Sequence, residues 1–168
     1  MGDTELTPVL PRPAVRVAVV MERETAPNRW EDWRFRIVEV VPHEDVFGVE
    51  ARVLRDDGKL QRSLHPGFTL ELFRDQAEGY FLNLTSGSPV WFVVWRIDDA
   101  DPSRAWPETV SVSYNEAGRW LDAQERVDNV PLAPELAAWL QAYTDEHYRP
   151  EPKKRRRPQS FITPGERR

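Results

Sequence analysis

The sequence predicts a mainly β (α+β) fold, an antiparallel sandwich or barrel-like meander of about eight strands, with a short helix and a C-terminal helix packed on it. Short apolar segments recur along the chain, with turn signals roughly every ten residues. No helical segments separate these strands, which argues against a parallel α/β fold. The chain of 168 residues is long enough to bury one hydrophobic core, although it contains no Cys for disulfides.

The strands are predicted from β-branched residues and from period-two alternation. Residues 15–21 form a short run rich in valine, and residues 33–40 alternate apolar with mostly charged side chains. Residues 46–54 and 59–64 flank the dipeptide Asp57-Gly58, which supplies the positive φ of a tight hairpin turn. Four more strands are expected at residues 68–73, 80–84, 90–97 and 108–114.

Two helices are predicted in the last third of the chain. Ser113 and Glu116 have the spacing of a capping box, which indicates a short helix that begins after Ser113. The segment 134–148 starts with Pro134 and is followed by Pro150, as expected at the two ends of a helix. Its apolar stripe should cover one open face or end of the sheet. The stripe consists of Leu136, Trp139, Leu140, Tyr143 and His147.

Composition and charge divide the chain into three parts. Residues 1–13 hold three Pro and are expected to form a flexible lead-in, and residues 14–148 form one globular domain. Residues 149–168 are expected to form a disordered tail; they carry eight Lys/Arg against two Glu, so the rest of the chain has a net charge of −11. The acidic body should repel nucleic acid, whereas the basic tail attracts polyanions.

Several classes of protein are excluded or disfavoured. No apolar run approaches the roughly 18 residues that span a bilayer, and the first residues do not resemble a signal peptide, so a cytoplasmic location is expected. The lack of Cys excludes thiol nucleophiles and zinc-thiolate sites. The three histidines, His43, His65 and His147, fall in different predicted elements, so no metal site is expected.

The densest group of titratable residues near turn signals is His65, Glu71 and Asp75, with Pro66-Gly67 beside the histidine. An enzyme would use His65 as a general base and one carboxylate to orient it. The structural alternative is a turn that ends a strand, with Glu71 on a solvent-exposed face. No nucleophile elbow or Gly-rich phosphate loop accompanies the group, so the chain is expected not to be an enzyme.

Two other features suggest partner binding. Trp30 and Trp33 lie among arginines, a combination found in protein hot spots and in base-stacking surfaces. The alternative is that they cover a sheet edge while Trp91, Trp95, Trp120 and Trp139 fill the core. A basic run in the tail could contact RNA, anionic lipid or an acidic protein surface, or could only solubilise the chain. The predicted partner-binding residues are Trp30, Trp33, Lys153, Lys154, Arg155, Arg156 and Arg157.

Several stretches of the sequence resemble an uncharacterised proteobacterial family of unknown function. They cover most of the domain, at residues 30–34, 64–75, 77–84, 112–120 and 147–153 with the basic run that follows. Genes of the family often lie beside those of molybdenum- or tungsten-dependent formate dehydrogenases. The resemblance therefore implies a non-catalytic accessory protein that helps to assemble or regulate such an enzyme by binding one of its subunits or a maturation factor. No cofactor is expected, and a molybdopterin-type cofactor is the alternative.

Some members of that family carry a label for the synthesis of the molybdopterin guanine dinucleotide cofactor. This chain has no Gly-rich nucleotidyltransferase loop after its first predicted strand, so the label is discounted as an activity. A small enzyme or a molybdopterin- or nucleotide-binding protein that uses the His65 region is the alternative. Nucleic-acid binding through the tail is a third possibility.

Overall fold

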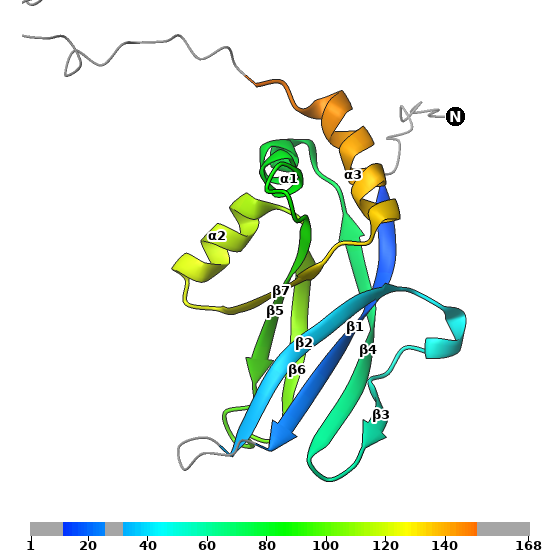
Figure 1. Cartoon of the computed structure of the whole chain (residues 1–168), viewed down its shortest axis with the longest axis vertical. Helices are drawn as coiled ribbons and strands as arrows, with labels where there is room; N and C mark the ends of the chain where they lie inside the picture. The colour runs from blue at the N-terminus through cyan, green and yellow to red at the C-terminus, as the bar shows by residue number, and fades with distance from the viewer. Residues whose placement is uncertain (1–11, 26–31, 151–168) are drawn as a thin grey trace, which may run out of the picture.

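The computed structural model describes residues 12–25 and 32–150, which form two antiparallel sheets and three α-helices. Residues 1–11 of the predicted lead-in, Trp30 and residues 151–168 of the predicted tail lie outside these residues. The helices gather at one end of the sheets, and the opposite end is formed by strands and their turns (Figure 1). Among the described residues, no helix has both the length and the apolar character needed to cross a membrane.

The first sheet has four strands in the order β2-β1-β4-β3, all antiparallel to their neighbours. The predicted hairpin is confirmed, because β3 and β4 are joined at Asp57-Gly58 and Gly58 has a φ of 86°. Strand β3 lies at one edge and pairs on one side only. The strands are β1 (Ala14–Thr25), β2 (Trp33–Pro42), β3 (Arg52–Asp56) and β4 (Leu60–Glu71).

The second sheet has three strands in the order β6-β5-β7, again antiparallel. Its strands are β5 (Val90–Ile97), β6 (Ala105–Ser111) and β7 (Arg126–Pro131). The edge strand β7 lies beside β2 of the first sheet, where the Ile37 N–H donates a 2.9 Å hydrogen bond to Asp128 Oδ2. The two sheets therefore face each other as a sandwich and do not merge into a closed barrel, which confirms the mainly β fold class.

The core lies between the two sheets and beneath the helices. Alternate residues of β1 separate two environments: Val17, Val19 and Met21 belong to the main core, whereas Ala18 and Val20 point to the outer face of the first sheet. Of the tryptophans expected in the core, Trp91 is fully buried and Trp95 and Trp139 pack against the core from partly buried positions. Trp120 is half-buried and is not part of this cluster.

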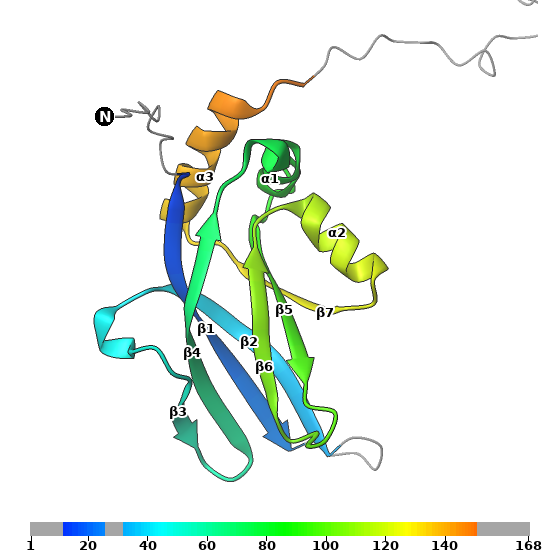
Figure 2. The same ribbon diagram turned by 180° about the vertical axis from the view of Figure 1, so that it is seen from behind.

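The helical end is formed by α1 (Ala77–Leu84), α2 (Tyr114–Asp122) and α3 (Pro134–His147). Two short 3-10 turns, η1 (Asp45–Phe47) and η2 (Arg74–Gln76), complete the elements. The predicted cap is confirmed for Ser113, whose side chain accepts a hydrogen bond from the Glu116 N–H. The reciprocal half of a capping box is not formed, because the Ser113 N–H donates to Ser111 Oγ and the Glu116 carboxylate accepts from the Ser111 hydroxyl. The predicted C-terminal helix is confirmed as α3, which packs beside α1 over the end of the sheets (Figure 2).

Four predicted elements are wrong in detail. The strand predicted at residues 46–54 begins only at Arg52, because the 3-10 turn η1 and a loop precede it. Residues 80–84 form the second half of helix α1, not a strand. Residues 59–64 and 68–73 are not separated by a turn at His65-Pro66-Gly67, since β4 continues through it as one strand of 12 residues. Gly67, with a φ of 93°, accommodates a register shift against β1. Strand β7 was not predicted, and its polar sequence shows none of the alternation on which the prediction relied.

Helix α1 is held against the rest of the domain by a very close contact. A Cβ atom placed on Gly79 would lie 2.1 Å from Ser113 Oγ, which leaves no room for any side chain. The Ser113 hydroxyl donates to Gln76 Oε1 at 2.7 Å, and the Glu116 carboxylate accepts from Ser111 Oγ at 2.8 Å. This polar cluster joins the start of α1 to the start of α2.

Asn83 adds a second link between α1 and the sheet. Its side-chain amide donates to the carbonyl oxygens of Val90 and Val112 and accepts from the Val90 N–H, at 2.8, 2.9 and 3.0 Å. Asn83 is 1% exposed. A buried side chain thus satisfies three backbone groups at the ends of β5 and β6, which explains why this segment is a helix that presents Asn83 to the sheet.

Candidate functional site

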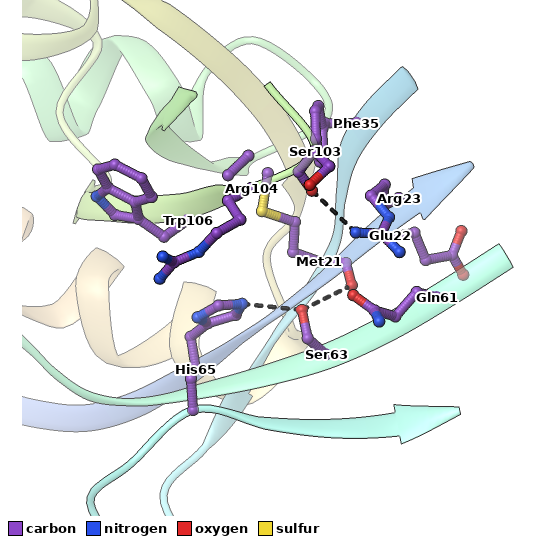
Figure 3. A pocket seen from close by; sticks show the side chains of 12 residues that line it. Met21, Glu22, Arg23, Phe35, Gln61, Ser63, His65, Ser103, Arg104 and Trp106 are labelled. Carbon is purple, nitrogen blue, oxygen red and sulfur yellow. Dashed lines mark hydrogen bonds between the residues drawn. The ribbon is translucent and has the colours of Figure 1, made fainter. Parts of the chain in front are cut away.

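A pocket of about 310 Å³ opens between β4 of the first sheet and β6 of the second (Figure 3). Met21 and Phe35 line it with apolar side chains. Polar groups enter from β4, at Ser63 and His65, and from the turn that precedes β6, at Arg104. The pocket therefore combines an apolar floor with a few polar groups, as small-molecule sites do.

His65 is placed in this pocket by its position on β4. The ring is half-buried, and its Nε2 atom lies 2.9 Å from Ser63 Oγ, which also donates to the Met21 carbonyl oxygen at 3.4 Å. These contacts fix the orientation of the ring. Burial lowers the pKa of His65 below its usual value, because desolvation disfavours the charged imidazolium.

Positive charge enters the pocket from Arg23 and Arg104. The Arg23 guanidinium donates to the Ser103 carbonyl oxygen at 2.9 Å and stacks over the Trp33 ring, 4.4 Å from its centroid. Arg104 is exposed, and Figure 3 shows its side chain extending toward His65 with Trp106 beside it. None of the ion pairs between described residues involves Arg104.

Glu22 follows Met21 on β1, but its carboxylate is neutralised by other residues. It is 3% exposed and accepts hydrogen bonds from the guanidinium groups of Arg36 and Arg62. Burial raises its pKa, but the hydrogen bonds from Arg62 and Arg36 outweigh that effect and hold the pKa below its usual value of 4.5. Glu22 is thus a paired structural carboxylate.

The predicted group of His65, Glu71 and Asp75 is spread along the chain. Glu71 is six residues beyond His65 on the same strand, about 20 Å away for an extended strand. It pairs with Arg12 at 3.6 Å, and Asp75 is exposed in η2. The pocket brings His65 together with Ser63, Arg104 and Trp106, which the sequence analysis did not single out. No local motif marks Arg104 and Trp106 as neighbours of His65, because they lie about 40 residues farther along the chain.

The outer face of the first sheet carries a second groove, of about 370 Å³. Its floor is formed by Val20, Val41 and Leu64, and its walls are Phe47 of the η1 loop and Leu54 of β3. No helix covers this side of the sheet (Figure 2). We call the groove together with the free edge of β3 the outer face.

Apolar side chains around the outer face are open to solvent. Val46 and Val49 of the η1 loop are 73% and 84% exposed, and Val53 and Leu54 of β3 are 54% and 47% exposed. All five residues of β3 are exposed. An edge strand with exposed apolar residues is the type of surface to which another chain can add as a strand.

The profile of the DUF3305 family, described as a protein of unknown function, matches residues 16–157. The chain belongs to this family. No curated protein and no solved structure matches it. The DUF3305 match spans both sheets and all three helices of the described residues, so the pocket and the outer face both lie within the family domain.

Two of the stretches that carry the resemblance in the sequence lie side by side in the fold. Residues 77–84 and 112–120 contain Gly79, Asn83 and Ser113, the residues that fasten α1 to α2 and to the second sheet. These stretches therefore maintain the fold. The stretch 64–75 includes His65 of the pocket and continues along β4 to η2.

Of the remaining predicted partner-binding residues, the structure describes Trp33. It begins β2, is half-buried, and its ring stacks against the Arg23 guanidinium. Trp30 and the basic run 153–157 lie outside the described residues. Within the described ranges, no group of three or more His, Asp or Glu side chains could hold a metal ion.

Proposed function

We propose that this protein is a non-catalytic accessory protein that binds a protein partner, namely a subunit or a maturation factor of a molybdenum-dependent formate dehydrogenase. The observation that supports protein binding is the outer face, where an unpaired edge strand adjoins an apolar groove. The identity of the partner rests on the resemblance in the sequence to a family encoded beside such enzymes.

The geometry of the outer face suggests how the partner binds. The free N–H and C=O groups of β3 can pair with an extended segment of the partner, which adds a fifth strand to the sheet. An apolar side chain of that segment can enter the groove between Phe47 and Leu54. Main-chain hydrogen bonds would then supply affinity, and the groove would supply specificity.

The chemistry of the described residues also supports a non-catalytic role. The Ser63–His65 pair has no carboxylate in hydrogen-bonding contact, whereas a catalytic base is commonly oriented by a third group. The carboxylates that the sequence offered as partners are engaged elsewhere or exposed, as Glu71 and Asp75 show.

Co-purification with a single-residue variant tests the proposal. Tagged full-length protein is expressed in formate-metabolising cells as wild type, as Leu54→Asp and as Leu121→Asp. Leu121 is a matched control, since it is an exposed leucine, 58% against 47% for Leu54, and lies on α2 away from the outer face. Wild type and Leu121→Asp should enrich a formate dehydrogenase subunit or maturation factor, and Leu54→Asp should not.

Deletion of the gene provides the second measurement. Formate dehydrogenase activity should fall in the deletion strain and return with wild type or Leu121→Asp, but not with Leu54→Asp. If neither component is ever enriched and the deletion leaves the activity unchanged, the proposed function is wrong.

A further inference from the structure

The pocket between β4 and β6 is independent of the outer face. It lies between the two sheets, whereas the outer face lies on the opposite side of the first sheet. The inner side of β4 contributes Ser63 and His65 to the pocket, and the outer side contributes Leu64 to the groove. One strand therefore serves both surfaces, and each can be altered separately.

The charge at the pocket is locally positive, although the whole chain carries a net charge of −5. Arg23 and Arg104 both line it. The carboxylates of Asp101 and Glu108 flank the pocket and are hydrogen-bonded to the Ser103 hydroxyl and to the Trp106 indole N–H, at 2.6 and 3.1 Å. Glu22, the one carboxylate among the lining residues, is already paired with two other arginines. None of the ion pairs between described residues involves Arg23 or Arg104, so both guanidinium groups can bind an anion.

The donors suit phosphate in particular. The Arg104 guanidinium can present two parallel N–H groups, and the Arg23 guanidinium keeps N–H groups that the Ser103 carbonyl does not use. The Ser63 hydroxyl is already engaged with His65 and with the Met21 carbonyl oxygen. The N–H groups of two separate guanidinium groups match the three terminal oxygens of a phosphate better than the two oxygens of a carboxylate.

The walls suit a flat ring. Trp106 is half-buried at the mouth of the pocket, and its indole N–H is directed to Glu108 Oε2 at 3.1 Å, which fixes the ring. Met21 and Phe35 provide an apolar floor. An aromatic ring and a thioether favour stacking with a planar apolar group. The volume of about 310 Å³ is at the lower limit for small-molecule sites, so the ligand must be small.

We propose that this pocket binds a small phosphorylated ring compound of the size of a nucleoside monophosphate, with its phosphate at Arg104 and its ring against Trp106. His65, which is hydrogen-bonded to Ser63, lines the same pocket. The site makes no covalent change to the ligand. This ligand site is additional to the proposed partner binding, because the ligand lies between the two sheets and the partner binds on the outer face of the first sheet.

Titration calorimetry of the full chain with GMP, AMP, guanosine and inorganic phosphate tests the proposal. At least one nucleotide should bind saturably, guanosine and phosphate should each bind at least about tenfold more weakly, and the two nucleotides show whether the base is distinguished. Arg104→Ala should weaken nucleotide binding at least about tenfold. Arg16→Ala is the matched control, since Arg16 is an exposed arginine of β1 outside the pocket, and it should bind as wild type does.

Trp106→Ala separates the two halves of the site. It should lower nucleotide affinity and leave the weak phosphate affinity unchanged, and Trp106→Phe should restore most of the nucleotide affinity. Absence of nucleotide binding, equal affinity for phosphate and nucleotide, or equal losses in Arg104→Ala and Arg16→Ala would each overturn the proposal. Circular dichroism of every variant confirms that it is folded, and Leu54→Asp, which removes the partner surface, should bind the nucleotide normally.

Discussion

The two ends of the molecule are built differently. At the helical end, α1 is held in place by the close approach of Gly79 to Ser113, by a hydrogen bond from Ser113 to Gln76, and by hydrogen bonds from Asn83 to the second sheet. At the other end, β3 is an exposed strand that pairs with β4 alone. The comparison shows that the domain concentrates its closest contacts at one end and exposes an unpaired strand edge at the other, which is the surface that we propose for a partner. Substitutions should therefore cost stability at the first end and binding at the second.

The largest effect is expected for Gly79→Ala. The added Cβ would collide with Ser113 Oγ and approach the Asn115 N–H, so α1 must shift away from α2. We expect the free energy of unfolding to fall by about 3 kcal/mol, the upper end of the usual cost of overpacking. Chemical denaturation measures this change.

Gly118→Ala is the matched control for that substitution. Gly118 lies inside α2, with nothing within 4 Å of its added Cβ, so alanine should stabilise the protein by roughly 0.5–1 kcal/mol. Equal effects of the two substitutions would show that the contact at Gly79 is not specific.

Asn83→Ala should have the next largest effect. The substitution leaves the carbonyl oxygen of Val112 and both backbone groups of Val90 without their side-chain partner in a buried place. We expect a loss of about 2–3 kcal/mol in thermal or chemical denaturation. Gln141→Ala is the control, since it removes an exposed amide that donates to Asp145. It should lower the free energy of unfolding by less than about 0.5 kcal/mol, and a larger loss would contradict the view that burial makes Asn83 important.

Glu22→Gln tests the paired carboxylate in the sheet. Because the folded state lowers the pKa of Glu22, the charge stabilises the fold above the usual value of 4.5, and this stabilisation disappears as the pH falls through the lower pKa of the folded state. Glu22→Gln should cost about 1–2 kcal/mol at pH 7, less than for a fully buried pair because both arginines are partly exposed.

The measurement is the free energy of unfolding of both proteins between pH 3 and pH 7. The difference between them should be full above about pH 5 and shrink below about pH 4.5. Glu24→Gln is the control, since Glu24 is exposed and lies 3.9 Å from Arg34, and it should change stability by less than about 0.5 kcal/mol. A difference that stays constant with pH would contradict the role of the charge.

The smallest effect on stability is expected for Leu54→Asp. Leu54 lies on the exposed edge strand, so its replacement should change the free energy of unfolding by no more than about 0.5 kcal/mol. The same variant should lose the partner in co-purification. A large loss of stability would show that β3 is a structural element and would remove the contrast between the two ends.

The sequence predicts elements whose signals are local. The Asp57-Gly58 hairpin, the cap at Ser113 and the helix that starts at Pro134 each depend on neighbouring residues, and all three are present. The segment 80–84 is rich in apolar and aromatic residues and was predicted as a strand. It is a helix because Gly79 fits against Ser113 and Asn83 bonds to the Val112 carbonyl oxygen, contacts with residues about 30 positions farther along the chain.

The candidate site was predicted only in part for the same reason. His65 was singled out for its chemistry and does line a pocket. Its neighbours in space, Arg104 and Trp106, come from β6 and the turn before it, about 40 residues away, and only the packing of the two sheets brings them to His65. The carboxylates Glu71 and Asp75 were chosen because they are close in sequence, but an extended strand carries them away.

The unpaired edge of β3 also has a consequence for the isolated protein in solution. The free N–H and C=O groups that we propose for a partner segment can also pair with the β3 strand of a second copy. This edge carries both signs of charge, since Arg55 pairs with Asp57 and Asp56 ends the strand, so charge repulsion opposes the pairing only weakly. Purified protein should therefore self-associate as its concentration rises, unless its partner already occupies the edge.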